Sequence, residues 1–589
     1  MNMQDIYKEA MGVNSTLDKN KLQEATKAFF EKLNHSTLPP YFNWVEEIFE
    51  GLHVKERGDQ PALIWADMDT DTERKFLYRE LAAKANRCLN FLRKNGINQG
   101  NNVYIINPII PETWFSTLAC LKGGIIHVPT ATSVTVRELK FRFENFPPHC
   151  VIAHETVADI VDEALFLSEF NKRGILKIAI GDKKGWHNYN ETEKENEVAD
   201  PAIIKKDDTL VCFFTSGTTG LAKMVGHNAY SYPLGHLSTA AFIGIRPGSI
   251  HHNLSAPGWA KWAWSSFFAP LSLGATVAAF NFTKLVPKKY LEFICKYKIN
   301  TFCAPPTAWR SFVREDLSQF DFSHLRYPVA AGEPLNPEVI QRFKACTNTT
   351  IRDFYGQTET VAMIGNYPWM EDRVKLGSFG MPGYMHDIAL LTDDIKEITE
   401  PDQIGLIAVK LDRWRPIGMF SGYLKDPAKN QEVFVDKYYL TGDRAYFDRD
   451  GYWWFVSRAD DVIKSSDYRV GPFEVESALV EHPAVLEAAV VGTPDPDRYQ
   501  LVKGYVILAK GYEPSKELAL ELFKHTMKIL PKYKIPRIIE FVSDVPKTIS
   551  GKIRRVELKN REETLKKDKN QRGEHEYFYF DFPELKSGN

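Results

Sequence analysis

The sequence predicts an α/β protein: a large multi-subdomain N-terminal domain with parallel sheets flanked by helices, a small β region, and a small α+β C-terminal domain. Three observations indicate this. The chain has 589 residues, whereas single hydrophobic cores stop growing near about 250–300 residues. Short apolar segments alternate with amphipathic helical ones up to about residue 345, as in parallel α/β folds. Near residues 386 and 458 the pattern changes to shorter, mixed segments.

The first clear α/β unit begins with a helix at residues 77–95, which place apolar side chains on one face before the helix-ending Gly96. A short apolar run at residues 103–106 predicts a strand, Pro111 opens a second helix, and residues 125–128 predict a second strand. A strand, a helix and a strand at this spacing predict a parallel pair. Similar alternation predicts later strands at residues 210–214, 275–280 and 301–304.

The C-terminal third predicts smaller units. Residues 386–409 alternate short apolar segments with acidic turns, which is typical of a small β region. The polar cluster at residues 458–461 interrupts the apolar pattern, so we place a domain boundary there. Beyond it, Pro472 opens a helix that runs through Val480, and residues 484–491 predict a strand. The predicted domains are residues 1–458, a hinge at 459–462, a C-terminal domain at 463–556, and a charged and aromatic tail at 557–589.

The tail allows two interpretations. Its charged part is followed by Tyr577-Phe578-Tyr579-Phe580, which can dock on the surface of the domain. The alternative is a frayed terminus, as most chain ends are.

Composition excludes several classes of function. Lysine and arginine number 74 and aspartate and glutamate 76, so no global field attracts nucleic acid or an acidic membrane. The seven cysteines are scattered and contain no Cys-x-x-Cys pair, which argues against a disulfide framework and a zinc site. The N-terminus does not resemble a signal peptide, and no apolar stretch reaches the roughly 18 residues of a membrane span. We therefore expect a soluble, cytoplasmic protein.

The strongest local signal is the segment from Thr215 to Lys223, which reads Thr-Ser-Gly-Thr-Thr-Gly-Leu-Ala-Lys directly after a predicted strand. Its glycines let backbone N–H groups turn toward an anion, its hydroxyls add donors, and Lys223 adds positive charge. Together these features suit a polyphosphate. The segment is not a Walker A loop, because two residues separate Gly220 from Lys223. An exposed turn is the alternative interpretation.

Three further clusters carry chemistry. Residues 353–359, Asp-Phe-Tyr-Gly-Gln-Thr-Glu, combine carboxylates that can hold Mg²⁺ with an aromatic ring beside glycine that can stack on a purine. Residues 439–443, Tyr-Leu-Thr-Gly-Asp, place an acid after a glycine turn, where it can accept both ribose hydroxyls. Residues 546–552, Pro-Lys-Thr-Ile-Ser-Gly-Lys, carry a lysine beyond a flexible glycine. A solvated edge turn and a solvated lysine are the alternatives for the first and the last cluster.

In this order, the four clusters resemble those of the adenylate-forming superfamily, which includes acyl-CoA synthetases, luciferases and peptide-synthetase adenylation domains. The chain is similar in particular to the medium-chain acyl-CoA synthetase branch, over residues 40–556. The similarity extends to residues 258–261, 331–335 and 457–464. It implies activation of a carboxylic acid with ATP to acyl-AMP and pyrophosphate, and then transfer to coenzyme A to give acyl-CoA and AMP.

The resemblance implies specific roles in ATP binding and catalysis. Thr358 contacts the α-phosphate and the acyl carboxylate, Glu359 holds Mg²⁺, and Lys552 bridges the carboxylate and the α-phosphate. Because two anions meet in this step, Mg²⁺ and a lysine stabilise it electrostatically. The candidate catalytic residues are Lys552, Thr358, Glu359 and Arg469. The candidate ATP-binding residues are Thr215, Ser216, Gly217, Thr218, Thr219, Gly220, Lys223, Gly332, Glu333, Pro334, Asp353, Phe354, Tyr355, Gly356, Gln357, Thr358, Asp443, Arg458 and Lys552.

The resemblance also implies that the C-terminal domain is mobile and rotates about Asp460 between the half-reactions. The candidate coenzyme A residues are Ser466, Asp467, Tyr468, Arg498 and Arg537. The candidate acyl-pocket residues are Trp259, Trp262, Gly332 and Gly356. Gly356 stands where acetate-specific relatives have a tryptophan, so we expect space for a medium-chain, branched or aromatic acid. Trp262 and Trp264 fit core positions equally well.

Three departures from the family pattern bear on function. Asp467 stands where the family commonly has a glycine on the thiol path, Ala222 stands where it has a proline, and Ala256-Pro257 stand where it often has Asp-Thr. Asp467 therefore keeps open an alternative acceptor, the phosphopantetheine of a carrier protein. Luciferase-like oxygenation is a further alternative, as is a non-catalytic nucleotide-binding homologue. No partner other than small molecules is indicated, and the oligomeric state, with a homodimer as one option, is left open.

Overall fold

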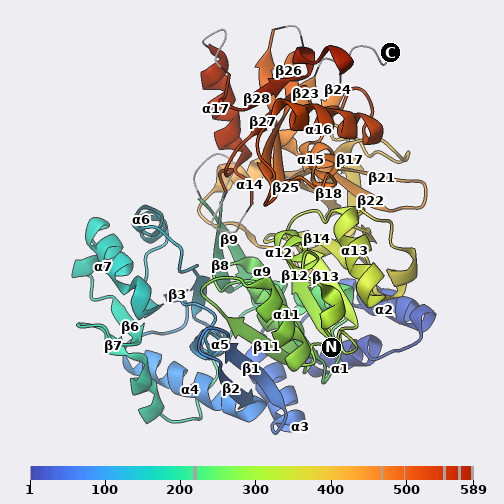
Figure 1. Ribbon diagram of the computed structural model, residues 1–589. Coiled ribbons are helices and arrows are strands. Elements are labelled where there is room, and N and C mark those ends of the chain that lie inside the picture. Colours follow the sequence, from blue (N-terminus) through green and yellow to red (C-terminus); the bar gives the residue numbers. More distant parts are fainter. Residues whose placement is uncertain are drawn as a thin grey trace. The chain divides into compact units, whose positions relative to one another are not determined.

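The chain forms two compact units in the computed structural model, which describes residues 2–216, 222–465, 468–496, 498–547, 552–567 and 572–585. Unit 1 comprises Met1–Asp387 and Lys410–Tyr439. Unit 2 comprises Ile388–Val409 and Leu440–Asn589. Each unit contains both helices and strands (Figure 1), which confirms the predicted α/β class.

The α/β unit predicted after residue 77 is confirmed. Helix α4 (Tyr78–Lys94) starts where the Glu80 carboxylate accepts the N–H of Leu77, and Gly96 beyond its end has a φ of +83°. Strand β3 and strand β4 pair in parallel, and the helix between them begins at Pro111. The bounds of these elements are β3 (Asn102–Ile106), α5 (Pro111–Lys122) and β4 (Ile126–Pro129).

One sheet of unit 1 has the strand order β19-β9-β8-β4-β3-β5-β6-β7 among the described residues. Its strands from β8 to β7 are parallel, whereas β9 returns antiparallel to β8 as a hairpin. The core under this sheet includes Tyr104, Leu139 and Val151. The remaining bounds are β5 (Cys150–His154), β6 (Leu176–Ile180), β7 (His187–Asn188), β8 (Thr209–Ser216), β9 (Ala222–Asn228), β19 (Gly422–Tyr423), α6 (Val136–Asn145) and α7 (Ala158–Leu167).

The other sheet of unit 1 has the described strand order β16-β15-β14-β13-β12-β10-β11-β1-β2. The strands from β14 to β1 are parallel, and antiparallel strands close both edges. The bounds are β1 (Pro61–Asp67), β2 (Thr72–Leu77), β10 (Ile250–Asn253), β11 (Thr276–Asn281), β12 (Thr301–Ala304), β13 (Tyr327–Ala331), β14 (Arg352–Gln357), β15 (Val361–Gly365), β16 (Met381–Pro382), α11 (Pro287–Lys296), α12 (Pro306–Phe312) and α13 (Pro337–Thr347).

Helix α8 (Ser231–Ile243) joins the two sheets of unit 1. It is buried along its whole length and packs against both β9 and β15. Burial on all faces is typical of a helix in such an internal position. The helix therefore brings the hairpin β8–β9 of one sheet close to the β14–β15 edge of the other.

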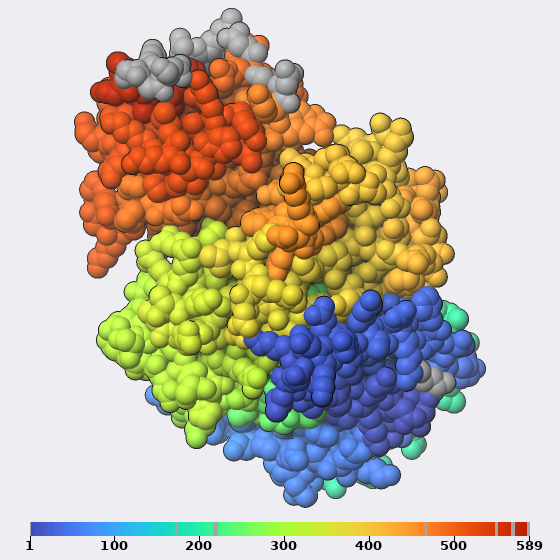
Figure 2. Space-filling view, turned by 90° about the vertical axis from the view of Figure 1, so that its right-hand side faces the viewer, coloured from blue at the N-terminus to red at the C-terminus, as the bar shows by residue number. Residues whose placement is uncertain are grey.

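The two N-terminal helices, α1 (Met3–Asn14) and α2 (Lys19–Asn34), belong to the body of unit 1. The Asn14 side chain donates to the carbonyl of Ile245, and the Asn34 side chain donates to the carbonyl of Tyr384. Figure 2 shows this part of the chain, in dark blue, lying on the surface of the unit.

Unit 2 contains most of the predicted β region and a mixed sheet. The β region holds β17 (Asp387–Leu391), β18 (Gly405–Lys410), β21 (Tyr438–Phe447) and β22 (Trp453–Arg458), and β20 (Phe434–Val435) pairs with β21. The mixed sheet, with helices α15 (Pro472–Val480), α16 (Lys516–Ile529) and α17 (Arg555–Lys567), holds β23 (Ile463–Ser465), β24 (Tyr468–Val470), β25 (Val485–Asp495), β26 (Tyr499–Leu508), β27 (Ile538–Phe541) and β28 (Glu576–Phe578).

The described part of the tail is built into this sheet, so its interpretation as a frayed terminus was wrong. Helix α17 packs on β25, and β28 pairs antiparallel with β27. Phe582 and Leu585 lie in the hydrophobic core of unit 2. Aromatic side chains at the end of a charged segment thus complete the core.

Unit 2 begins before the predicted C-terminal domain, because it includes the small β region. The residues of the predicted hinge lie in a short 3₁₀ turn, Ala459–Asp461. A division into compact units does not locate an axis of rotation. The boundaries at residues 458, 462 and 556 therefore remain predictions.

Candidate active site

The phosphate-binding candidate lies on the β8–β9 hairpin. Thr215 at the end of β8 is paired with Lys223 at the start of β9. The predicted residues Gly217, Thr218, Thr219 and Gly220 lie outside the described residues, and Ser216 is described by its backbone alone. The two described ends place Lys223 at the base of the predicted loop.

The predicted adenine-binding residues lie on two adjacent parallel strands. Ala331, the last residue of β13, is in register with Phe354 of β14. The chain therefore leaves both strands at one edge of the sheet, where ligands of α/β sheets commonly bind. Gly332 follows with a φ of +108°, a conformation that favours glycine, and a side chain built there would meet no atom within 4 Å.

Asp353 ties the segment after β13 to β14. Its Oδ2 accepts the N–H of Leu335 at 3.2 Å, and its side chain is buried. Burial raises the pKa of Asp353 to about 8, although the N–H groups of Leu335 and Phe354 and the charge of Lys261 oppose the rise. The carboxyl group is therefore neutral at pH 7. Lys261, in turn, donates to the Ala331 carbonyl at 3.1 Å.

The carbonyl of Thr358 is held by two buried donors. His227 Nε2 donates to it at 2.7 Å and the Tyr232 hydroxyl at 3.2 Å. Because a carbonyl only accepts, the proton of the imidazole is on Nε2, and Nδ1 accepts from the Ser231 hydroxyl at 2.9 Å. Burial lowers the pKa of His227 to about 3, so the ring is neutral at physiological pH.

Tyr423 brings the two strongest clusters of the sequence together. Its strand, β19, pairs with β9, and its hydroxyl donates to Glu359 Oε1 at 2.8 Å. The Lys223 Nζ lies 5.2 Å from the centroid of the Tyr423 ring, a cation–π distance. Close by, the Tyr439 hydroxyl donates to Gln357 Oε1 at 3.0 Å. The lysine of the phosphate-binding candidate and the acid of the metal-binding candidate thus share one aromatic neighbour.

The acyl-pocket candidates lie in different surroundings. Trp262 is 1% exposed and packs edge-on against Trp114 with ring centroids 5.0 Å apart, as its core interpretation predicts. Trp259 is half-buried, beside Gly258, where a Cβ would come within 2.1 Å of the Ala131 nitrogen. At Gly356 a Cβ would come within 2.0 Å of the Val361 carbonyl oxygen. Strand pairing therefore requires this glycine, and its role in opening an acyl pocket remains a prediction.

In unit 2, the ribose-binding candidates lie on one hairpin. Asp443 of β21 is in register with Arg458 of β22, and Gly442 before it has a φ of +76°. The Asp443 side chain is 8% exposed, whereas Arg458 is exposed. The structure thus brings both predicted residues together.

Lys552 is exposed and precedes helix α17 closely. An isolated antiparallel bridge between Lys547 and Ile553 joins the two ends of the segment that contains Lys552. The predicted hinge residue Asp460 is also exposed, and its carbonyl accepts from Lys559 of α17 at 2.6 Å.

The described coenzyme A candidates form two groups on unit 2. Tyr468 is half exposed and stacks on Tyr533 with ring centroids 4.5 Å apart, and the neighbouring Arg469 donates to Asp393 at 3.0 Å. Burial, and secondarily the charge of Arg498, lower the pKa of Arg537. Ser466 and Asp467 lie outside the described residues.

Comparison with protein families decides the identity of the fold. Residues 52–424 match the family described as AMP-binding enzyme, and residues 474–552 match the AMP-binding enzyme C-terminal domain. The chain belongs to the AMP-binding enzyme family. The predicted resemblance to adenylate-forming enzymes is thereby confirmed.

Relatives of this AMP-binding enzyme are similar over nearly the whole chain. The chain is 50% identical over 578 residues to 4-hydroxybutyrate--CoA ligase 1 of Metallosphaera sedula. The matched region covers 98% of this chain and 100% of the relative. It is 37% identical to the mitochondrial acyl-coenzyme A synthetase ACSM3 of Mus musculus, over 89% of this chain and 91% of the relative.

Two solved structures of AMP-binding enzymes share the fold. The anthranilate CoA ligase AuaEII in complex with anthranoyl-AMP has a TM-score of 0.81 and 27% identity, over 90% of this chain and 98% of that one. An acyl-CoA synthetase of Brucella canis has a TM-score of 0.68 and 31% identity, over 95% and 99%. Among the described residues of this chain, none of the helices has the length and apolar character to cross a membrane.

Several residues of the AMP-binding enzyme site had no individual role assigned from the sequence: His227, Tyr232, Lys261, Tyr423 and Tyr439. Of these, Lys261 and Tyr439 lie inside the quoted segments 258–261 and 439–443. His227 lies near a quoted motif, so a polar side chain in an apolar strand was an available signal. Tyr423 gave no such signal, because its contact with Glu359 depends on the pairing of β19 with β9.

Proposed function

We propose that this chain is an AMP-forming acid–CoA ligase that activates a short- or medium-chain carboxylic acid with ATP and transfers the acyl group to coenzyme A. The observation that carries the proposal is the cluster of Lys223, Tyr423 and Glu359, which joins a phosphate-binding candidate to a metal-binding candidate. Membership of the AMP-binding enzyme family supports the nucleotide, and the relatives that are named as CoA ligases support the acceptor.

Adenylate formation requires an acid carboxylate to approach the α-phosphorus of ATP. Both groups are anionic, so the barrier is lowered by cations placed in advance. Lys223 adds positive charge beside the predicted polyphosphate loop, and Lys552 adds it from unit 2. Thr358 is fixed by the donors on its carbonyl, which orient the turn that carries its hydroxyl.

Glu359 is the proposed ligand of Mg²⁺. A carboxylate beside phosphate oxygens is the donor set that this ion prefers, and Tyr423 holds one oxygen of Glu359 in a fixed direction. Bound there, Mg²⁺ would supply neutralisation of phosphate charge. The residues of this chain that orient the nucleotide around it are Asp443 and Arg458 for the ribose and the segments after β13 and in β14 for the adenine.

Thioester formation is the second half-reaction. The coenzyme A thiolate attacks the acyl carbonyl of acyl-AMP, and AMP leaves with the oxygen that came from the acid. We place the nucleotide end of coenzyme A at Arg498 and Arg537, since basic side chains suit its phosphates. From the family resemblance we assign Ser466, Asp467 and Tyr468 to the pantetheine path, Arg469 to the adenylate phosphate, and Asp460 to the hinge between the two half-reactions.

The acid that we propose to test first is 4-hydroxybutyrate, because the relative with 50% sequence identity is named for it. Gly332 leaves open space at the edge of the sheet, and the half-buried Trp259 supplies a wall for an aliphatic chain. A cytoplasmic location fits the seven free cysteine thiols, which a reducing compartment maintains. The oligomeric state, with a homodimer as one option, is to be measured by sedimentation.

An acid panel tests the proposal. Purified protein is given ATP, Mg²⁺ and 4-hydroxybutyrate, butyrate, hexanoate or benzoate, and ATP–pyrophosphate exchange is measured with and without coenzyme A. We expect exchange with at least one aliphatic acid, and AMP and acyl-CoA in equal amounts once coenzyme A is added. Absence of exchange with every acid, together with ATP binding, would instead indicate the non-catalytic homologue.

The carrier-protein acceptor remains a second candidate because Asp467 stands where the family commonly has a glycine on the thiol path. In that case exchange would occur with an acid, but AMP would accumulate only after addition of a phosphopantetheinylated carrier. Measuring AMP with coenzyme A and with the carrier in parallel distinguishes the two acceptors.

A further inference from the structure

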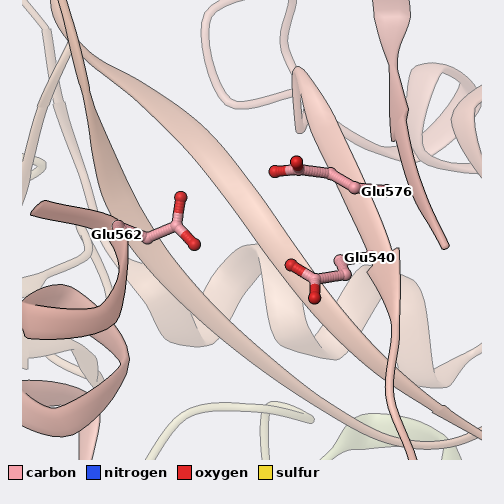
Figure 3. Close-up of side chains that lie close together, drawn as sticks. All are labelled: Glu540, Glu562 and Glu576. Carbon is pink, nitrogen blue, oxygen red and sulfur yellow. The ribbon is translucent and has the colours of Figure 1, made fainter. Parts of the chain in front are cut away.

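A fully buried lysine lies among three glutamates in unit 2. Lys503 of β26 has a side chain that is 0% exposed, and its Nζ lies 2.6 Å from Glu540, 2.7 Å from Glu562 and 2.6 Å from Glu576. The three carboxylates are themselves at most 3% exposed. Figure 3 shows them pointing toward a common space from two strands and from the chain at helix α17.

The position of Lys503 explains this acidic cluster without a metal ion. One oxygen of each carboxylate lies within 4.8 Å of the others, a spacing that a cation would suit. The ammonium group has three N–H donors and faces three carboxylates, so it takes the place of that cation. Arg561 contacts Glu540 and Lys566 contacts Glu576, so three cations balance three carboxylates.

The cluster connects four elements that are far apart in the sequence. Lys503 belongs to β26, Glu540 to β27, Glu562 to α17 and Glu576 to β28. The Tyr505 hydroxyl of β26 donates to Glu562 as well. Glu562 is therefore one polar attachment of helix α17 to the sheet, beside the contact of Arg561 with Glu540 of β27, and Glu576 attaches the last strand to Lys503.

Helix α17 continues directly from the segment that contains Lys552. Arg555 at its start donates to both oxygens of Glu476 on α15, at 2.7 and 2.8 Å. Before Lys552, Lys547 is bound to Glu487 of β25 at 2.7 Å. The residues on either side of Lys552, Lys547 and Arg555, are therefore both bound to other elements. Because Arg555 belongs to α17, its position depends on how α17 packs on the sheet.

We propose that Lys503 and its three glutamates are positioning residues for adenylate formation, because they fix helix α17 on the sheet and thereby fix the segment that carries Lys552. The inference rests on the proposed role of Lys552. Stability alone is a weak reason for such a cluster, since buried ion pairs are often replaced by apolar side chains at no loss. A cluster that must keep one helix in one register has a reason to be ionic.

Two variants test the proposal, Lys503→Met, which keeps the length of the side chain, and Glu562→Gln, which keeps its shape. For each, two rates are measured with the full-length protein: butyrate-dependent ATP–pyrophosphate exchange, and thioester formation from supplied butyryl-AMP and coenzyme A. Displacement of a positioned group by about 1 Å can cost about 100-fold in rate. We therefore expect exchange to fall by about 10- to 100-fold, with the thioester rate unchanged within about threefold.

A matched control comes from unit 1. Lys122 is also buried, and it donates to Glu50 at 2.7 Å and to Asn86 at 2.9 Å; both partners, among the described residues, belong to unit 1 and not to α17. Lys122→Met should change both rates by the same factor. If Lys503→Met also changes them by the same factor, or leaves exchange intact, the cluster is structural and the proposal is overturned.

Two further measurements keep the outcome clear. If neither variant folds, Tyr505→Phe removes only the hydroxyl that donates to Glu562, and it should lower exchange by a smaller factor while sparing the thioester rate; equal effects on both would overturn the proposal. Lys552→Ala serves as the reference. If Lys552→Ala retains exchange, the role proposed for Lys552 fails. If Lys552→Ala loses exchange and the variants of the Lys503 cluster keep it, the positioning role alone is overturned.

Discussion

Replacing Tyr423 by phenylalanine should weaken adenylate formation without unfolding the protein. The substitution removes the hydroxyl that donates to Glu359 Oε1 at 2.8 Å and keeps the ring beside which Lys223 lies. A hydrogen bond to a charged group contributes about 1.5–3 kcal/mol. If that contribution is made in the transition state of adenylation, the rate falls by about 10- to 150-fold, at about 1.4 kcal/mol for each factor of ten.

The assay is ATP–pyrophosphate exchange at saturating acid over a range of Mg·ATP concentrations. A double-mutant cycle with Glu359→Gln isolates the interaction, because Tyr423→Phe should have little further effect once Glu359 has lost its charge. Tyr297 is the matched control, since its hydroxyl also donates to a carboxylate, that of Glu73, elsewhere in unit 1. Unchanged exchange in Tyr423→Phe, or additive effects in the cycle, would refute the assignment of Tyr423 as the residue that orients Glu359.

Three further predictions follow from the same site. Burial raises the folded-state pKa of Asp353 to about 8. The stability gained from its neutral form is therefore complete below about pH 4 and is lost as the pH rises to about 8. Over this pH range the thermal midpoint of the wild type should fall relative to that of Asp353→Asn, and parallel profiles of the two proteins would contradict the shift. His227→Phe leaves the Thr358 carbonyl with one donor fewer, and we expect exchange to fall by about tenfold, whereas an unchanged rate would show that Tyr232 alone suffices. Asp467→Gly should leave exchange unchanged and raise the thioester rate with coenzyme A; a slower thioester step would mean that Asp467 assists the transfer.

Much of the fold could be predicted from local patterns. The helix at α4 was predicted because its apolar side chains repeat with the helical period, and the strands β3, β4 and β12 because they are short apolar runs; Gly96 and Pro111 mark boundaries. For the tail, docking of the aromatic residues was one of two interpretations, but burial of its glutamates could not be predicted, because charged residues look solvated in isolation. Glu562 and Glu576 are buried only because Lys503, far earlier in the sequence, supplies the charge that balances them.

The candidate site shows the same division. Thr215, Lys223 and Glu359 were recognisable, because their motifs are contiguous and their residue types suit phosphate and metal. Tyr423 was not recognisable, because its place beside Glu359 depends on the antiparallel pairing of β19 with β9. The pattern of apolar residues does not predict this pairing. Gly356 was predicted to open a pocket, and the structure supplies another reason for it, the close approach of the Val361 carbonyl.

The most direct test of the central claim follows oxygen from the acid. The protein is given ATP, coenzyme A and butyrate labelled with ¹⁸O in both carboxylate oxygens, and the products are analysed by mass spectrometry. Because the carboxylate attacks the α-phosphorus and the thiolate then displaces AMP, one ¹⁸O should appear in each AMP and one should remain in each butyryl-CoA. Formation of ADP or labelled phosphate, or AMP without ¹⁸O, would contradict an acyl-adenylate intermediate.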